Sequence, residues 1–267
     1  MRELLESVAA GEVSPADAEA RLAGYATNDA GRFDAARETR RGVPEAILGD
    51  GKTPEETASL AATAVETTGR AIVTRTDDDQ RRAVRRRLAD DHPETEVTVH
   101  ERSGVVVAHA ADFEPPDVAA TVGVVTAGTS DAIPAGEAAV VATEMGATVE
   151  RVEDVGVAAL TRIVDQLDRL RGADVLIVAA GREGALPTVV AGLVDTPVIG
   201  LPVSTGYGFG GDGEAALSGM LQSCSVLSVV NVDAGFVAGA QAGLIARAVA
   251  SGGDESTGDS RDETASE

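Results

Sequence analysis

Short apolar runs alternate with helical stretches through the second half of the chain. The runs are rich in valine and isoleucine and are bounded by glycine, proline or aspartate, so each one predicts a buried β-strand. They lie at residues 121–128, 147–154, 174–181, 196–203 and 226–233. Regular alternation of strand and helix predicts a parallel sheet with helices on both faces, because each crossover lays its helix back onto the sheet. We therefore predict an α/β fold whose C-terminal domain is a three-layer, doubly wound parallel sheet.

The N-terminal part of the chain predicts a smaller α/β domain. Residues 1–31 predict two short helices, the second opened by Ser14 as N-cap and Pro15 at the first helical position. The pattern then predicts a helix from about Thr53, a strand at 70–75, a helix from about Asp77, and strands at 96–101 and 104–110.

Two adjacent prolines within residues 112–118 stop regular structure and predict a linker. This places an N-terminal domain at 1–113 and a carboxyl-terminal domain at 119–251. Residues 252–267 are polar, acidic and rich in glycine and serine, a composition that cannot bury a core, so we predict a disordered tail.

The chain is strongly acidic. It has 44 acidic and 22 basic residues, a net charge of −22, and Lys52 as its only lysine. A carboxylate-rich, lysine-poor surface indicates a protein of high-salt surroundings, where screening makes the self-repulsion tolerable. It argues against nucleic acid as a partner, since phosphate neutralisation needs a basic face. The one basic cluster, 81–87, predicts a solvated, ion-paired helix face.

The cellular compartment follows from cysteine usage and hydropathy. Cys224 is the only cysteine and neither terminus has the pattern of a secretion signal, which predicts the reducing cytoplasm. No apolar stretch reaches transmembrane length, so we expect no membrane partner.

Three glycine-rich loops follow predicted strands of the parallel sheet. They hold Thr129, Ser130 and Asp131 in the first loop, Glu183 in the second, and Gly206, Tyr207 and Gly208 in the third. Open α/β sheets bind ligands at the carboxyl ends of their strands, so the three loops together predict a ligand site.

Simpler roles fit the same residues. The first loop is also typical of a helix cap, and Glu183 is also typical of a first-turn carboxylate stabilised by the helix dipole. All three histidines, His92, His100 and His109, are scattered over the N-terminal domain. The sequence therefore predicts neither a Ser-His-Asp triad nor a metal-ligand cluster.

The motifs of the C-terminal domain resemble the aminoimidazole ribonucleotide carboxylase of purine biosynthesis. The similar segments are "AGTSD", "ALP" followed by "VVAGL", "TPVIGLPVS" and "AGLIA". One departure is informative, because Ala185 stands where the purine enzyme has a histidine for proton relay.

The whole chain resembles the pyridinium-3,5-biscarboxylic acid mononucleotide synthases of nickel-pincer cofactor biosynthesis, the LarB family. Shared segments are "EGALP", "STGYG", the "SC" that contains Cys224, and "GKT" at 51–53. The N-terminal motif "D..R..R.G.PE" is present as Asp34, Arg37, Arg40, Gly42, Pro44 and Glu45. The resemblance covers about residues 33–250.

This resemblance implies a flavodoxin-like C-terminal domain and a carboxylase that also acts as a hydrolase. The implied substrate is nicotinic acid adenine dinucleotide, with carbon dioxide or bicarbonate as co-substrate, Mg²⁺ as cofactor and AMP as a product. A homo-oligomer, an octamer as in the purine carboxylases, is also implied. The implied catalytic residues are Cys224, Glu183 and Asp131. The implied substrate-binding residues are Thr129, Ser130, Gly206, Tyr207, Gly208, Asp34, Arg37 and Arg40.

The residue types suit this chemistry. A nicotinate pyridinium is electron-poor, so a ring carbon can attack carbon dioxide only after a nucleophile has turned the ring into an enamine. A cysteine thiolate is both a strong nucleophile and a good leaving group, which fits Cys224. Glu183 is then the base that removes the ring proton, and Arg37 and Arg40 clamp phosphate or carboxylate through forked hydrogen bonds.

The position of Cys224 raises a difficulty. It precedes its predicted strand, whereas the glycine-rich loops follow theirs, so the thiol lies at the wrong edge of the sheet. Either a neighbouring subunit supplies it or its loop folds over the edge. Two other functions stay open: an aminoimidazole ribonucleotide carboxylase, against which Ala185 argues, and a non-catalytic nucleotide-binding module.

Overall fold

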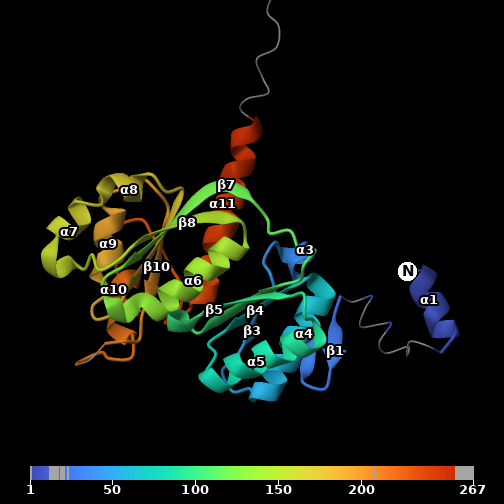
Figure 1. The fold of residues 1–267 in the computed structure, drawn as a ribbon. Coiled ribbons are helices and arrows are strands. Elements are labelled where there is room, and N and C mark those ends of the chain that lie inside the picture. Colours follow the sequence, from blue (N-terminus) through green and yellow to red (C-terminus); the bar gives the residue numbers. More distant parts are fainter. Residues whose placement is uncertain (1, 12–17, 19–21, 23, 207, 256–267) are drawn as a thin grey trace, which may run out of the picture. The chain divides into compact units, whose positions relative to one another are not determined.

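A computed structural model describes residues 2–11, 18, 22, 24–206 and 208–255 of the chain (Figure 1). The chain divides into two compact units, Met1–Glu114 and Pro115–Glu267. The division falls within the proline-containing segment 112–118. No helix in the described ranges is long and apolar enough to cross a membrane.

The C-terminal unit is built on a five-stranded sheet. Its strands are β7 (Val118–Thr126), β8 (Ala147–Val152), β9 (Val175–Ala180), β10 (Val198–Pro202) and β11 (Ser228–Val229). They lie in the order β11-β10-β9-β7-β8, and every neighbouring pair is parallel. This confirms the predicted α/β class and the doubly wound parallel sheet. The fifth predicted strand, 226–233, has only two residues in the ladder, Ser228 and Val229.

Helices cover both faces of this sheet. On one face of the sheet, alternate side chains of the strands pack against α6 (Ala132–Glu144) and α11 (Gly235–Glu255). The other face packs against α7 (Thr161–Val164), α8 (Leu167–Arg171), α9 (Ala185–Ala191) and α10 (Glu214–Leu221). In β9, for example, Ile177 faces α6 and α11 whereas Leu176 and Val178 face the opposite layer. Burial on both faces explains why the central strands are continuous apolar runs.

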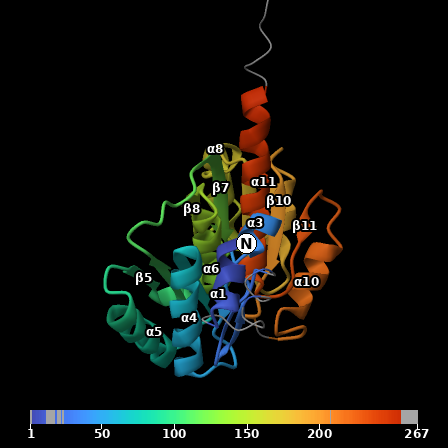
Figure 2. The ribbon, with the colours of Figure 1, turned by 90° about the vertical axis from the view of Figure 1, so that its right-hand side faces the viewer.

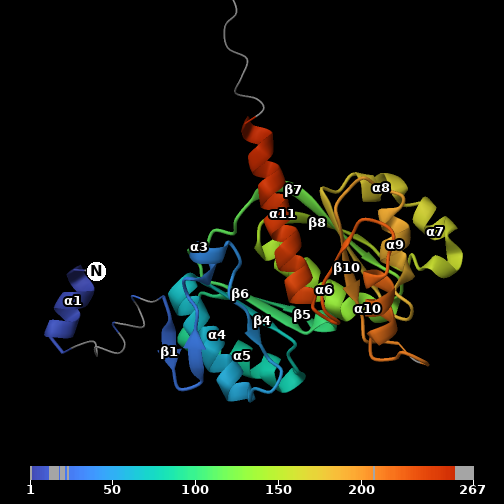
Figure 3. The same cartoon turned by 180° about the vertical axis from the view of Figure 1, so that it is seen from behind.

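Close approach of backbones brings α6 and α11 together on one face of the sheet. A Cβ atom on Gly239 of α11 would lie 2.4 Å from the carbonyl oxygen of Ala138 in α6, so only glycine allows this contact. Figure 2 shows α11 along one side of the sheet, and Figure 3 shows α9 beside α10.

The N-terminal unit contains a four-stranded sheet with two helices packed on it. The strands lie in the order β3 (Ile47–Leu48), β4 (Arg70–Thr74), β6 (Val105–His109) and β5 (Glu96–His100). β3 and β4 are parallel and the other pairs are antiparallel. α4 (Pro54–Thr68) and α5 (Asp78–Asp91) share its core. Both begin with the capping box that places Thr53 and Asp77 at their N-caps, which confirms the predicted helix starts.

Three elements near the N-terminus complete the described structure. α1 (Arg2–Ala9) is the first of the two predicted helices, and most of the second lies outside the described residues. A small hairpin of β1 (Ala26–Asn28) and β2 (Gly31–Phe33) and the short helix α3 (Arg37–Arg41) follow it. The prediction of helices through residue 31 is therefore wrong for 26–31, where the Asn28 side chain accepts hydrogen bonds from the backbone and closes a turn. At the other end, α11 continues to Glu255, beyond the predicted domain end at 251, and the remainder of the predicted tail lies outside the described residues.

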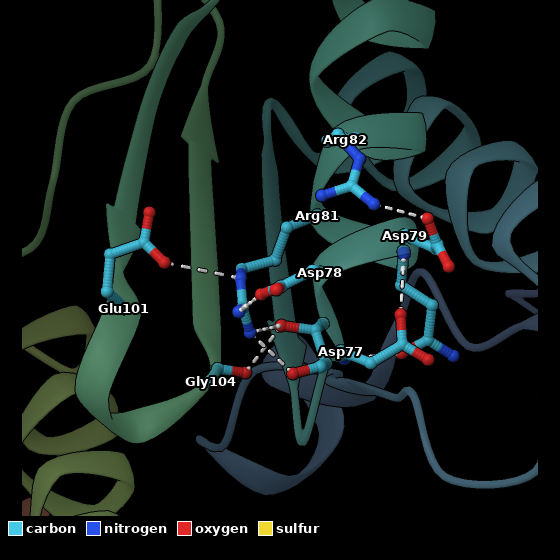
Figure 4. A network of polar contacts seen from close by, with 9 residues as sticks. Asp77, Asp78, Asp79, Arg81, Arg82, Glu101 and Gly104 are labelled. Carbon is cyan, nitrogen blue, oxygen red and sulfur yellow. Dashed lines mark hydrogen bonds and ion pairs between the residues drawn. The ribbon is translucent and has the colours of Figure 1, made fainter.

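The basic cluster of α5 is paired with carboxylates (Figure 4). Arg81 contacts Asp78 and also lies 3.5 Å from Glu101, while Arg82 contacts Asp79. The carboxylates of these pairs are largely exposed, and exposed pairs contribute only about 0–1 kcal/mol each. Residues 82 and 85–87 are the exposed arginines that the charge pattern predicts, and Arg82 and Arg87 are ion-paired. Arg81 departs from the prediction, because its side chain is only 14 % exposed and it also donates to the carbonyl oxygen of Thr76.

Candidate active site

A cavity of about 360 Å³ lies at the carboxyl ends of the central strands. The strand order reverses at β7, because β8 lies on one side of it and β9 on the other. Crevices at such switch points are where doubly wound sheets bind ligands. The cavity is lined by residues from 127–131 after β7, 156–162 after β8, 180–186 after β9, and by Thr205 after β10.

Asp131 shapes the first loop from a buried position. It is 3 % exposed, and its Oδ2 accepts a hydrogen bond of 2.8 Å from the backbone N–H of Gly128. Burial raises the pKa of Asp131, and hydrogen bonds from Gly128 and Ser130 oppose that rise. Ser130 also lines the cavity, whereas Thr129 is exposed in the same loop and is not among the lining residues.

The second loop presents Glu183 at the cavity wall. Glu183 is exposed and is followed by Gly184 with φ 65°, a left-handed conformation that favours glycine. A Cβ atom at Gly184 would also lie 2.4 Å from the carbonyl oxygen of Ala216. Both the backbone conformation and this close contact therefore favour glycine. Ala185 also lines the cavity, and its methyl group offers no proton relay there.

A second cavity of about 280 Å³ adjoins the first through shared residues. Arg182 and Glu183 line both cavities, and Gly206 and Gly208 of the third loop line the second. The third loop also contacts the first, because Thr205 Oγ1 donates a hydrogen bond of 3.3 Å to the carbonyl oxygen of Ser130. Tyr207 lies outside the described residues. The three predicted loops thus line two neighbouring cavities at one edge of the sheet.

Two arginines of this site were not predicted from the sequence. Arg162 of α7 and Arg182 both line the first cavity. Arg162 Nη1 donates to the carbonyl oxygen of Asp154 at 2.8 Å and lies 3.1 Å from Asp154 Oδ2. The only sequence signal for Arg162 is its place shortly after a strand of the parallel sheet. Both residues give the cavity cationic groups that suit an anionic ligand.

Cys224 lies away from both of these cavities in its own chain. The thiol is exposed in the loop between α10 and β11 and is not among the residues that line either cavity. The next residue, Ser225, donates from Oγ to the carbonyl oxygen of Thr188 in α9 at 3.1 Å. This loop is at the amino end of β11, whereas the cavities lie at the carboxyl ends of the strands. A five-residue strand such as β10 spans about 16 Å between these two edges of the sheet. Leu221 and Val226 beside the thiol are 65 % and 95 % exposed.

The charged residues of the N-terminal motif pair with one another. Arg40 Nη2 lies 2.6 Å from Asp34 Oδ2, and Arg37 Nη1 lies 2.8 Å from Glu45 Oε2. The hydrogen bond to Asp34 raises the pKa of Arg40. Gly42 follows the two arginines and ends α3 with a φ of 68°. The motif belongs to the N-terminal unit, where Asp34 and Glu45 line a separate cavity of about 400 Å³.

Metal ligands do not gather at any of these places. Within the described ranges, no group of three or more His, Cys, Asp or Glu side chains is arranged to hold a metal ion. Mg²⁺ is commonly held by only one or two carboxylates together with substrate phosphates, and Asp131 and Glu183 are carboxylates that line the first cavity.

Comparisons with known proteins match both units. Residues 25–110 match the family model of the LarB/PurE-like N-terminal domain, and residues 121–266 match that of AIR carboxylase. An uncharacterised protein of Methanocaldococcus jannaschii is 37 % identical over 221 residues, which cover 81 % of this chain and 84 % of that protein. Among solved structures, a PurE2 variant of Treponema denticola is 19 % identical with a TM-score of 0.36, covering 52 % of this chain and 98 % of that chain.

Proposed function

The chain belongs to the AIR carboxylase family and carries a LarB/PurE-like N-terminal domain, and from this premise we propose that it carboxylates the pyridinium ring of nicotinic acid adenine dinucleotide. In the same proposal it hydrolyses the phosphoanhydride bond, so that the products are pyridinium-3,5-biscarboxylic acid mononucleotide and AMP. The family membership supports a carboxylase-type enzyme, and the substrate and the hydrolysis are the proposed part.

The observation that carries the choice of substrate is the methyl group of Ala185 at the cavity wall. Aminoimidazole is already an enamine and its carboxylation needs proton relay, for which the purine enzyme has a histidine at this position. A pyridinium has no electron pair to offer and needs a nucleophile. Cys224, the only cysteine of the chain, supplies one.

The proposed reaction begins with addition of the Cys224 thiolate to ring carbon 4. The ring electrons move onto nitrogen and give a dihydropyridine. Its carbon 5 attacks carbon dioxide, which forms the new carbon–carbon bond and leaves an iminium. Loss of the proton from carbon 5 restores the enamine, and the nitrogen electron pair then expels the thiolate from carbon 4. The net change replaces a ring proton by a carboxylate and regenerates the free cysteine.

Glu183 is the proposed base for the proton on carbon 5. It lines both cavities on an exposed loop, so its carboxylate can reach a ring bound in either. Asp131 of the first loop is the third proposed catalytic residue, and burial raises the pKa of its carboxyl group. The proposed cradle for the ligand is Thr129, Ser130, Gly206, Tyr207 and Gly208.

Assembly is proposed to bring the thiol to the ring. Cys224 lies at the amino end of β11 and the cavity lies at the carboxyl ends of the neighbouring strands, so a second subunit is the simplest source of the nucleophile. Exposed Leu221 and Val226 flank the thiol, and burying them in a subunit interface is favourable. We propose a homo-oligomer, with an octamer as the expected assembly.

Arg37 and Arg40 are proposed to bind anionic groups of the substrate. Each already pairs with a carboxylate, Glu45 or Asp34, so a substrate anion has to share or replace that partner. Mg²⁺ is proposed to assist cleavage of the phosphoanhydride bond by binding the pyrophosphate oxygens that the substrate brings. None of the carboxylation steps above depends on it.

The test is incubation of the full-length protein at high salt with nicotinic acid adenine dinucleotide, Mg²⁺ and ¹³C-bicarbonate, with mass spectrometry of the products. The expected result is AMP and a mononucleotide that carries one ¹³C-labelled carboxylate. A parallel incubation with aminoimidazole ribonucleotide tests the alternative function. Carboxylation of that substrate, with the dinucleotide recovered unchanged, contradicts the proposal.

A further inference from the structure

Arg162 enters the first cavity with only one edge of its guanidinium engaged. Nη1 is held by the backbone carbonyl and the carboxylate of Asp154. Nε is buried and has no hydrogen-bond partner among the described residues. Among the residues that the structure describes, the edge formed by Nε and Nη2 therefore has no protein partner.

This edge has the geometry that carboxylates prefer. Nε and Nη2 carry parallel N–H groups, and the two oxygens of one carboxylate accept both of them in a forked pair. A buried donor without a partner is destabilising, and a ligand that supplies the acceptor removes that penalty. Asp154 meanwhile fixes the other edge, so the guanidinium is oriented before the ligand arrives.

The order of the strands indicates which group of the ligand meets Arg162. Glu183 follows β9 and Arg162 follows β8, and β7 lies between these two strands. In the proposed reaction the base removes a proton from ring carbon 5. The carboxylate of nicotinate is on carbon 3, which lies on the other side of carbon 4. A ring that turns carbon 5 toward Glu183 thus turns its carboxylate toward the β8 side.

We infer that Arg162 binds the ring carboxylate of the substrate and makes the site selective for nicotinate over nicotinamide dinucleotides. The inference rests on the proposed function for the orientation of the ring. A carboxamide presents one oxygen and an NH₂ group, so it cannot accept from both N–H groups of the fork. Sites built to pair a specific polar group reject analogues that leave it unpaired.

Arg182 provides a matched control in the same cavity. It lines both cavities, so a phosphate common to the two dinucleotides is the group expected beside it. Removing Arg182 therefore weakens both ligands alike, whereas removing Arg162 weakens only the acid.

The experiment measures the dissociation constants of nicotinic acid adenine dinucleotide and of its amide counterpart by calorimetry at one fixed salt concentration. All proteins carry Cys224→Ser, so that covalent addition does not contribute. The protein with Arg162 is expected to bind the acid about 10- to 100-fold more tightly than the amide, the range for a charge-assisted pair. Arg162→Ala is expected to abolish this preference by weakening the acid alone. Arg162→Lys keeps the charge without the fork and is expected to retain only part of the preference.

Several results overturn the inference. They are the absence of a preference before Arg162 is changed, an equal loss for both ligands in Arg162→Ala, and loss of the preference in Arg182→Ala instead. If Arg162→Ala does not fold, an unaltered acid preference in the folded Arg162→Lys variant has the same meaning. The proposed function fails separately: an Arg162-dependent preference in these binding measurements, with no carboxylated product from the protein that retains Cys224, contradicts the reaction and leaves the inference standing.

Discussion

Gly219→Ala tests whether the packing of α10 positions Glu183. Gly219 lies inside this helix, where alanine is favoured over glycine by about 0.5–1 kcal/mol. A Cβ atom there would lie 2.3 Å from the backbone carbonyl oxygen of Glu183. Helix propensity and packing therefore predict opposite outcomes for this substitution.

Packing is expected to dominate. Ordinary contact begins at 3.4 Å, so the Glu183 backbone or the helix has to move by about 1.1 Å, the difference between 3.4 and 2.3 Å. The atom contacted is a backbone oxygen, which cannot rotate away as a side chain can. Overpacking of this kind destabilises by about 1–3 kcal/mol, which leaves a net loss of up to about 2.5 kcal/mol after the gain in propensity of about 0.5–1 kcal/mol. That loss lowers the Tm by about 2–4 °C for each kcal/mol.

The effect on activity is expected to be larger than the effect on stability. A catalytic group misplaced by about 1 Å loses up to about 100-fold in rate. The assay compares the Tm and the rate of carboxylation of the variant with those of the unaltered protein at the same salt concentration.

Gly192→Ala is the control for this substitution. Its Cβ has nothing closer than 3.5 Å and its φ is −84°, so we expect an unchanged or slightly raised Tm and full activity. Gly219→Ala with unaltered Tm and rate, or an equal loss of rate in both variants, refutes the reasoning.

Three further predictions concern other parts of the molecule. Burial raises the pKa of Asp131, so the folded state disfavours its charged form; wild-type stability is then greatest below the pKa of an exposed aspartate and declines as pH rises through the raised value. Asp131→Asn should therefore gain Tm over wild type from acid to neutral pH, and a pH-independent difference speaks against this cause. Arg37→Ala removes a partly exposed ion pair, so we expect at most about 1 kcal/mol of lost stability and a raised KM for the dinucleotide; an unchanged KM assigns Arg37 to structure. Val226→Asp should dissociate the oligomer in light scattering and abolish carboxylation, and a fully active monomer excludes a shared site.

The layered fold was accessible from the sequence because its central strands are buried on both faces. The apolar run of β9 follows directly from that burial, since alternate residues face opposite helix layers. The β11 region shows the limit of this argument, because Val226 is apolar and yet 95 % exposed in the single chain. An apolar residue in such a run predicts burial, but the sequence does not show whether the residue is buried by its own chain or by another subunit.

The N-terminal hairpin could not be recognised from periodicity. Its strands have three residues each, too few for an alternation to show. Asn28 holds the turn instead, because its Oδ1 accepts from the backbone N–H groups of Ala30 and Gly31 and its Nδ2 donates to Thr63 of α4. One side chain thus bonds both the backbone of the turn and a helix distant in sequence. Such a contact depends on the tertiary structure, so a local sequence pattern does not reveal it.

The edge of the sheet that holds the candidate site and its carboxylates was predictable, and its arginines were not. Glycine-rich loops after parallel strands place Asp131 and Glu183 at one edge by topology alone. Arg162 was missed because a single arginine in a short helix is equally typical of a solvated face. The partners of Arg37 and Arg40 were missed for a related reason, since the spacing of charges along a motif does not show which of them pair.

The most direct test of the account is the mass of the intact protein after incubation with nicotinic acid adenine dinucleotide in the absence of bicarbonate. Without a carboxyl donor the reaction stops after addition of the thiolate to the ring. We expect an added mass of the dinucleotide or its mononucleotide half, located on the peptide that contains Cys224 and absent from the folded Cys224→Ser variant. An adduct on another residue, or a Cys224→Ser variant that carboxylates the ring at the wild-type rate, contradicts it.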